Sequence, residues 1–230
     1  MGFYPLSSTC QIQRLGTIYE AVFGQRTDGT FVEVGAFDGD RYSNTSCLAD
    51  VGWRGLYIEP VPLHVAICRE RHRGNVGVQV LECAIGATPG RRPIQLAQLF
   101  SSFHTEAVEA SKDVFRNLRS DEALVPFDEI FTGDTAMVDV RRLDAVLTEQ
   151  AIAPRFEVLV VDVEGHETEV FDSFDLRAWT PQLIIVELLD LHPRYGKDAG
   201  EMAALRARIL SHGYAHLHVD EVNTVFERID

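Results

Sequence analysis

Five acidic residues stand where apolar, strand-like segments of this sequence end. Each lies at or within one residue of the carboxyl end of such a segment: Glu33, Glu59, Glu82, Asp162 and Glu187. In an open α/β sheet, ligands bind in the crevice outside the carboxyl ends of the strands. One acid at such a position is more often a surface or capping residue. Five at equivalent positions indicate a ligand site.

The first acid begins a turn that contains two glycines, Glu33-Val34-Gly35-Ala36-Phe37-Asp38-Gly39-Asp40. Glycines let the backbone turn tightly and let a ligand approach it closely. The dinucleotide fingerprint G-x-G-x-x-G is absent, because Phe37 and Asp40 stand where its second and third glycines belong. A P-loop is also absent, because no Gly-Lys-Ser/Thr follows. The turn therefore favours a nucleoside ligand without a pyrophosphate.

S-adenosylmethionine fits this pattern, because it carries a ribose, an adenine and an amino-acid end with both charges. We expect Glu33 and Asp38 to face its ammonium group, and Glu59 to accept hydrogen bonds from both ribose hydroxyls. A helix expected near Ser43-Asn44-Thr45 would present N–H groups to its carboxylate. The other predicted cofactor contacts lie in the turn, in the start of this helix and at later strand ends: Gly35, Ala36, Gly39, Ser43, Asn44, Pro60, Ala84 and Asp162.

Alternating strand and helix patterns must position these residues. The expected strands cover residues 31–34, 56–58, 76–81, 156–161 and 183–186, followed by closing strands 214–219 and 225–228 with Asn223 in the turn between them. The expected helices cover residues 12–23, with Ser8 or Thr9 as the cap and Gly24 at the end, and residues 63–71, 168–174 and 202–213. Strands that alternate with helices predict a parallel sheet covered on both faces.

The length of 230 residues fits one large domain. We expect a single domain over residues 1–230, in which residues 1–30 form an N-terminal helical segment. Residues 91–138 fit the alternation worst, because a helical pattern over 108–118 is followed by Pro126 and Gly133. We interpret them as an insertion over the sheet, either a lid or a substrate-binding element. The alternative is a solvated helix with a loop.

Taken together, these motifs resemble the FkbM-type methyltransferases. The resembling segments are 33–39 with Ser43-Asn44-Thr45, 52–60, Leu143-Asp144, Val161-Asp162-Val163-Glu164-Gly165-His166-Glu167, and the strand that ends at Glu187. The resemblance implies a Rossmann-like, doubly wound, mostly parallel sheet of seven strands. It also implies S-adenosylmethionine as methyl donor and usually an oxygen acceptor on a small molecule or sugar. The chain departs from the family at Val160, where lysine is common, so any role of that lysine is lost or moved.

Methyl transfer to an alcohol needs a base within reach of the hydroxyl proton. The candidates follow the fourth and fifth expected strands: Asp162, Glu164, His166 and Glu187. The alternative interpretation of His166 is an exposed histidine near a helix start. Glu167 is expected to be a first-turn acid that complements the helix dipole.

Three of these acids, Asp162, Glu164 and Glu187, can also form an oxygen-rich site for a divalent cation such as Mg²⁺. The alternative is that hydrogen bonds hold the three carboxylates in one crevice. Asp190 and His192 are weaker candidates for further metal ligands. Ser101 and Ser102 are candidates to face the acceptor, although an ordinary turn is the favoured interpretation of both.

Composition narrows the partners. Lys and Arg number 21 against 35 Asp and Glu, and the resulting net charge of −14 disfavours nucleic acid and anionic membranes. An Asn/Asp-Pro-Pro-Tyr/Phe motif, which marks methylation of exocyclic amines, does not follow the fourth strand. No apolar run approaches 18 residues and no signal-peptide pattern is present, so cytoplasm is the default location. The cysteines at 10, 47, 68 and 83 form no C-x-x-C pair, which argues against a cysteine zinc site.

The expected function is therefore O-methylation of a small molecule or sugar, with S-adenosylmethionine as the cofactor. A second copy of the chain is one source of the acceptor site. Two alternatives stay open. One is an NAD(P)-dependent oxidoreductase on a similar sheet, and the other is a module that binds S-adenosylmethionine without catalysis.

Overall fold

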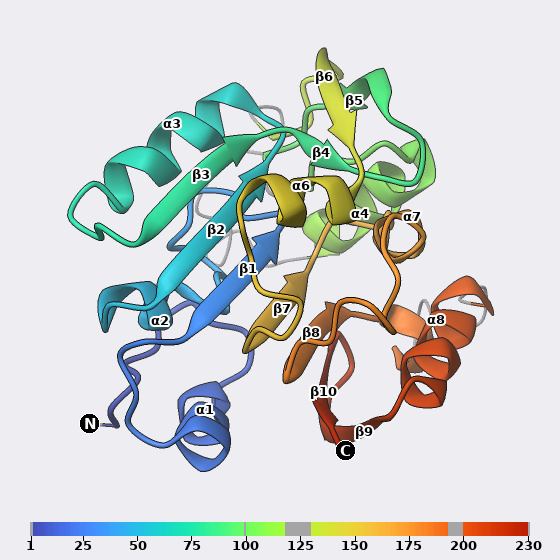
Figure 1. Cartoon of the computed structure of the whole chain (residues 1–230). Coiled ribbons are helices and arrows are strands. Elements are labelled where there is room, and N and C mark those ends of the chain that lie inside the picture. Colours follow the sequence, from blue (N-terminus) through green and yellow to red (C-terminus); the bar gives the residue numbers. More distant parts are fainter. Residues whose placement is uncertain (1, 99, 118–129, 193–199, 230) are drawn as a thin grey trace.

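The computed structural model describes residues 2–98, 100–117, 130–192 and 200–229. In this part of the chain, a seven-stranded sheet has the order β3-β2-β1-β7-β8-β10-β9 (Figure 1). Its strands are β1 Thr30–Val34, β2 Arg54–Glu59, β3 Val78–Glu82, β7 Val158–Val161, β8 Leu183–Glu187, β9 Tyr214–Val219 and β10 Asn223–Arg228. Strands β3, β2, β1, β7 and β8 are parallel, and β10 runs antiparallel to both β8 and β9. The Rossmann-like, mostly parallel sheet of seven strands is confirmed.

Helices cover both faces of this sheet, because alternate strand residues belong to two separate apolar cores. On one face, Val32 and Leu159 share a core with residues of α6 Leu143–Glu149, α7 Glu167–Phe171 and α8 Gly200–Ser211. On the other face, Phe31 and Val158 share a core with residues of α1 Leu15–Phe23, α2 Ser46–Asp50 and α3 Pro62–Arg71. Strands buried on both faces explain the near-continuous apolar runs in the sequence.

The N-terminal helix is shorter than predicted. Helix α1 begins at Leu15, so the expected cap at Ser8 or Thr9 is wrong, whereas its end at Gly24 is confirmed. The hydroxyl of Thr9 accepts a hydrogen bond from the Tyr42 backbone N–H instead. Turns precede the helix, and in them Ile12 is buried against the core without being helical.

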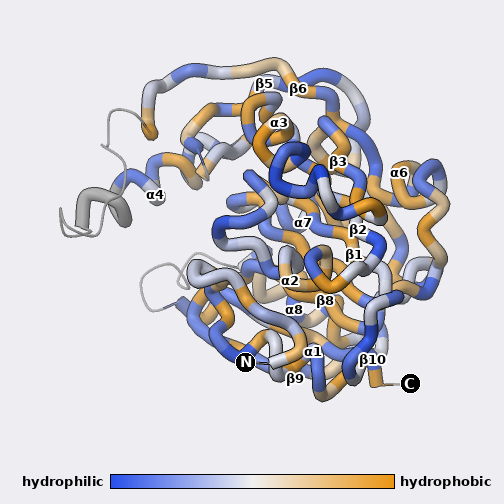
Figure 2. The backbone as a smooth tube through the Cα atoms, turned by 90° about the vertical axis from the view of Figure 1, so that its left-hand side faces the viewer, coloured by the Kyte–Doolittle hydropathy of each residue, from blue (hydrophilic) through white to orange (hydrophobic). Residues whose placement is uncertain are grey.

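The inserted region contains a second sheet that the sequence patterns did not predict. Strands β4 Ala84–Ile85, β5 Gly90–Gln95 and β6 Thr135–Arg141 form it in the order β4-β6-β5. The pattern failed at β5 because Ile94 is its one buried residue, so no apolar alternation is visible. The predicted helix is present as α4 Thr105–Asn117, at the periphery of the molecule in Figure 2. Leu118 and Pro126, which belonged to that prediction, lie outside the described residues.

Smaller differences concern element boundaries. Helix α6 was not predicted, β7 begins two residues later than expected, and α7 begins one residue earlier. Asn223 opens β10 rather than forming the turn, because Asp220 Oδ1 accepts hydrogen bonds from the N–H groups of Val222 and Asn223. A single 3₁₀ turn, η1 Leu189–Leu191, follows β8. Among the described helices, none combines the length and the apolar character that a membrane crossing requires.

Candidate active site

A cavity lies between the carboxyl ends of the main sheet and the inserted segment. Gly35, Glu59 and Asp162 line it from the ends of β1, β2 and β7, and Ile94 and Phe103 line it from the insertion. A second cavity adjoins the first and shares part of its lining: Gly35, Phe37, Asp162 and Glu164. The crevice predicted at the strand ends is therefore present, and the insertion forms its opposite wall.

The predicted cofactor residues divide into two groups. Those that line at least one cavity are Glu33, Gly35, Ala36, Ser43, Glu59, Pro60, Ala84 and Asp162. Asp38, Gly39 and Asn44 line neither of these cavities. They belong to the same loop and contact other protein groups instead.

Gly35 makes the turn at the end of β1. Its φ is +86°, a backbone conformation that favours glycine. The N–H groups of Gly35 and Ala36 both donate to the carbonyl of Ile58, at 3.0 and 3.2 Å. This turn therefore packs tightly between the ends of β2 and β7.

Glu59 ends β2 and is almost fully buried. Its Oε2 accepts a hydrogen bond from the Phe37 N–H at 3.0 Å, and its Oε1 accepts one from the Val61 N–H at 2.9 Å. These contacts fix both oxygens at the cavity wall. Each carboxylate oxygen can accept more than one hydrogen bond, so Glu59 can still accept hydrogen bonds from two ribose hydroxyls.

Glu33 organises the loop that follows the glycine turn. Its carboxylate accepts hydrogen bonds from the hydroxyls of Ser43 and Thr45 and from the N–H of Asn44. Burial raises the pKa of Glu33 to about 7, although these three donors act in the opposite direction. The carboxylate is thus occupied by the protein itself, and its predicted contact with an ammonium group stays a prediction.

The three residues outside the cavities hold the same loop in place. Asp38 pairs with the Arg41 guanidinium at 2.6 Å and accepts the N–H groups of Asp40 and Arg41. The carbonyl of Asn44 accepts the Tyr19 hydroxyl at 2.8 Å. Gly39 has a φ of +73° and packs against the ring of His72. These residues therefore stabilise the loop that carries the cavity-lining residues.

Three carboxyl groups meet at the ends of β7 and β8. Asp162, Glu164 and Glu187 each place one oxygen within 4.8 Å of the other two. Burial raises the pKa of Asp162 to about 6, and a hydrogen bond from the Glu187 side chain opposes this. Burial, followed by repulsion between the carboxylates, holds the pKa values of Glu164 and Glu187 well above their usual range. The cluster therefore shares protons, and it can accept a proton or hold a cation.

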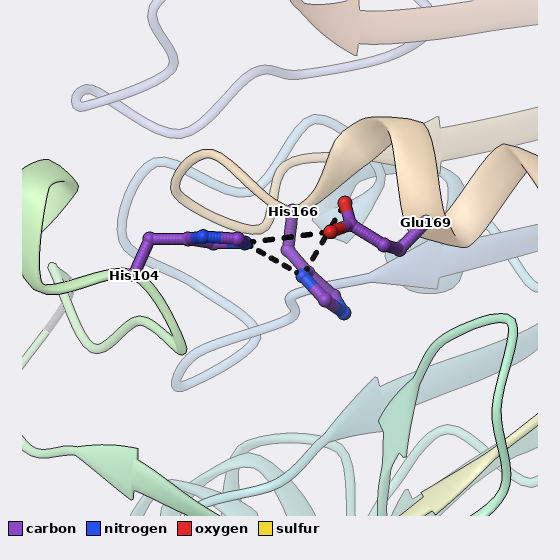
Figure 3. Close-up of side chains that lie close together, drawn as sticks. All are labelled: His104, His166 and Glu169. Carbon is purple, nitrogen blue, oxygen red and sulfur yellow. Dashed lines mark hydrogen bonds and ion pairs between the residues drawn. The ribbon is translucent and has the colours of Figure 1, made fainter.

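His166 is 2% exposed, so its interpretation as an exposed histidine is wrong. Its Nδ1 lies 2.9 Å from Nε2 of His104 and 3.4 Å from a carboxylate oxygen of Glu169 (Figure 3). Its Nε2 is buried and finds no hydrogen-bond partner among the residues that the structure describes. Burial, then His104 and Arg92, lower the pKa of His166 to about 4, so the ring is neutral at pH 7.

Other expectations near the site have mixed outcomes. Glu167 begins α7 as expected, but its carboxylate is buried and accepts the N–H groups of Val163 and Gly165. Ser101 and Ser102 line the cavity, yet the Ser101 hydroxyl donates to the Gln98 carbonyl in a local turn, and the Ser102 hydroxyl donates to the Glu164 carbonyl after β7. Asp190 does not join the carboxyl cluster, because both its oxygens bind Arg206.

Sequence reasoning missed several residues of the site. Phe103 and His104 come from the insertion, whose path over the sheet no sequence pattern revealed. Glu169 was recoverable, because His166 and Glu169 have the three-residue spacing that brings side chains together on a helix. Val160, at the position where the family commonly has lysine, is fully buried in the core and lines neither cavity.

Comparisons with known proteins identify the family of this chain. The family model described as the methyltransferase FkbM domain matches residues 33–215. A putative O-methyltransferase from Klebsiella pneumoniae has 13% identity and a TM-score of 0.50, covering 99% of this chain and 83% of that one. An O-methyltransferase from Bacillus cereus in complex with SAH has 13% identity and a TM-score of 0.47, covering 98% of this chain and 83% of that one.

A precorrin-6y C5,15-methyltransferase from Geobacter metallireducens has 12% identity and a TM-score of 0.46, covering 99% of this chain and 94% of that one. A search among curated proteins found no match. At such low identity, the likeness to the Klebsiella protein shows the fold alone.

Proposed function

Because the chain belongs to the FkbM methyltransferase family, we propose that it transfers a methyl group from S-adenosylmethionine to a hydroxyl oxygen of a small molecule or sugar. The observation that carries this proposal is the meeting of Gly35, Glu59 and Asp162 around one cavity at the strand ends. These residues come from three strands that are far apart in the sequence. In this proposal, Gly35 provides the turn beside the cofactor, Glu59 binds its ribose, and Asp162 faces the acceptor.

The residues that line the cavities support S-adenosylmethionine as the cofactor, which supplies the methyl group when it is bound. Glu59 is fixed by two backbone N–H groups and keeps acceptor capacity for the ribose hydroxyls. Pro60, Cys83 and Ala84 supply an apolar wall for the adenine. Gly35 and Ala36 form the floor next to Asp162. Carboxylates around the site also favour a cationic sulfonium.

The carboxyl cluster supports an oxygen acceptor, because a hydroxyl must lose its proton during the transfer. Asp162 lines both cavities and therefore lies between the two halves of the site. With a pKa of about 6, its carboxylate is ionised at pH 7 and can receive that proton. The carboxyl groups of Glu164 and Glu187 lie beside that of Asp162, so its protonation state depends on theirs. In this proposal His166 contributes to the acceptor side of the cavity.

The inserted segment supports a small acceptor. Ile94 and Phe103 place apolar surface opposite the carboxyl cluster, which suits a compact molecule with one reactive hydroxyl. The net charge of −14 supports an acceptor other than nucleic acid. Magnesium at Asp162, Glu164 and Glu187 is part of the same proposal, because three carboxylates form an oxygen-rich set.

A turnover assay tests the proposal. The protein is incubated with S-adenosylmethionine and a panel of sugars, phenols and hydroxy acids, and S-adenosylhomocysteine and methylated products are identified by mass spectrometry. We expect an oxygen-methylated product, and activity that falls in Asp162→Asn but not in the exposed variant Glu82→Gln. A nitrogen- or carbon-methylated product would contradict the O-methyl proposal. Cofactor binding without any turnover would favour the non-catalytic module.

A further inference from the structure

A second cluster of side chains lies beside the cavity, and the proposed transfer gives a role to only one of its members, His166. It consists of His104, just before α4, with His166 and Glu169 at the start of α7 (Figure 3). One ligand-type atom from each residue lies within 4.8 Å of the other two. The three side chains come from the insertion and from the main domain, so the fold and not local sequence brings them together.

The three atoms have the spacing of metal ligands. His104 Nε2 and His166 Nδ1 are 2.9 Å apart. Oε1 of Glu169 lies 3.7 Å from His104 Nε2, and its other oxygen, Oε2, lies 3.4 Å from His166 Nδ1. Zinc binds imidazole nitrogen and carboxylate oxygen at about 2.0–2.2 Å with tetrahedral angles, which places ligand atoms roughly 3.3 Å from one another. The observed separations lie on both sides of this value.

The unpartnered nitrogen of His166 is an independent observation that points to a ligand. This side chain is almost fully buried, and its Nε2 has no hydrogen-bond partner in the described structure. A histidine that binds a metal through Nδ1 keeps its proton on Nε2 and donates it to an acceptor or water. A proton on Nε2 would leave the lone pair of Nδ1 directed at His104 and Glu169, as a metal ligand requires.

The surroundings allow an ion to enter and stay. The side chains of His104 and Glu169 are 36% and 37% exposed, so the cluster is reachable from solvent. Arg92, a cation near this cluster, places its guanidinium carbon 4.8 Å from the centroid of the Phe103 ring. The carboxylate of Glu169 offsets part of an ion's charge, and three protein ligands leave a fourth position open.

We propose that His104, His166 and Glu169 form a binding site for one divalent transition-metal ion of the zinc class. The ion links the segment before α4 to α7. It thereby holds in place the part of the cavity wall that Ser102 and Phe103 form. The inference does not rest on methyl transfer, because it concerns metal binding by the unliganded protein.

Calorimetry with Zn²⁺ tests the site directly, using the full chain after treatment with a chelator. We expect one ion per chain, with Co²⁺ at the same site giving the visible absorption bands of tetrahedral coordination. His104→Ala and Glu169→Gln should each weaken Zn²⁺ binding by at least about tenfold, because loss of even an outer-shell partner costs that much. Both side chains are partly exposed, so these variants should fold, and circular dichroism checks this.

Two further variants separate this site from the other metal-binding groups. Glu187→Gln alters the carboxyl cluster, and His218→Ala removes a histidine that pairs with Asp220 at the surface. Both should bind Zn²⁺ as the parent does. Absence of stoichiometric Zn²⁺ binding by the parent would overturn the proposal. Unchanged binding in His104→Ala, or loss of binding in Glu187→Gln with His104→Ala unaffected, would overturn it as well.

Discussion

A Cβ atom on Gly35 would lie 1.7 Å from the carbonyl oxygen of Asp162. The two strand ends therefore approach so closely that only a residue without a side chain fits between them. The glycine of the motif and the acid after β7 are parts of one packing arrangement, although Gly35 and Asp162 lie on strand ends from distant parts of the sequence. This arrangement brings the turn and the carboxyl cluster to one cavity.

Gly35→Ala tests that packing. The change adds a clash with the Asp162 backbone and forces alanine into a positive φ, so we expect a loss of more than about 2 kcal/mol in the free energy of unfolding. Urea denaturation measures it. Gly74→Ala is the matched control, because nothing lies within 4 Å of its Cβ position, and it should change stability little. Equal stability of the two variants would contradict the close approach.

Glu59→Gln tests the ribose contact. The substitution removes the charge that strengthens hydrogen bonds to the hydroxyls, so we expect S-adenosylhomocysteine to bind about ten- to a hundredfold more weakly. Calorimetry measures the change in Kd. Glu82→Gln is the control, because Glu82 pairs in register with Glu59 on the adjacent strand but is exposed and lines neither cavity. An unchanged Kd in Glu59→Gln would contradict the proposed contact between Glu59 and the ribose.

Glu33 makes stability depend on pH. Its pKa is raised by burial from 4.5 to about 7, so the folded chain binds more protons than the unfolded chain between these values. Its contribution to stability is complete below about pH 4.5 and is lost as the pH rises through 7. We expect Glu33→Gln to flatten this decline when unfolding is measured across the range. If the stability of Glu33→Gln declines equally steeply with pH, other carboxyl groups cause the decline.

Asp190→Asn tests a buried ion pair that sequence reasoning had considered as part of a metal site. Asp190 binds the Arg206 guanidinium through two bonds of 2.6 and 2.8 Å, and both side chains are nearly buried. Leaving that guanidinium without its counter-charge should cost about 3–5 kcal/mol. Asp28→Asn alters an exposed pair with Arg26 and should cost far less, because solvent screens that pair. Thermal denaturation compares the two, and equal costs would contradict the account.

The main sheet could be predicted because both its faces are buried. Residues such as Val158 and Val160 lie in one core and Leu159 and Val161 in the other, so β7 is apolar throughout and stands out in the sequence. The glycine turn and Glu59 could be placed for a related reason, since parallel strands all end at one edge.

The insertion could not be predicted in the same way. Strand β5 buries Ile94 and exposes most of its other residues, so it shows no strand periodicity. The contact of His104 with His166 depends on how this segment crosses the sheet, and no local pattern encodes it. The role of Asp38 was also hidden, because its binding of the turn N–H groups and Arg41 is a matter of loop geometry.

The central claim is that the cavity at Gly35, Glu59 and Asp162 binds S-adenosylmethionine, and a calorimetric titration of the folded protein with S-adenosylhomocysteine tests it most directly. The account predicts saturable binding at one site per chain, competed by S-adenosylmethionine. Absence of binding at millimolar ligand, in a protein that circular dichroism and cooperative unfolding show to be folded, would contradict it.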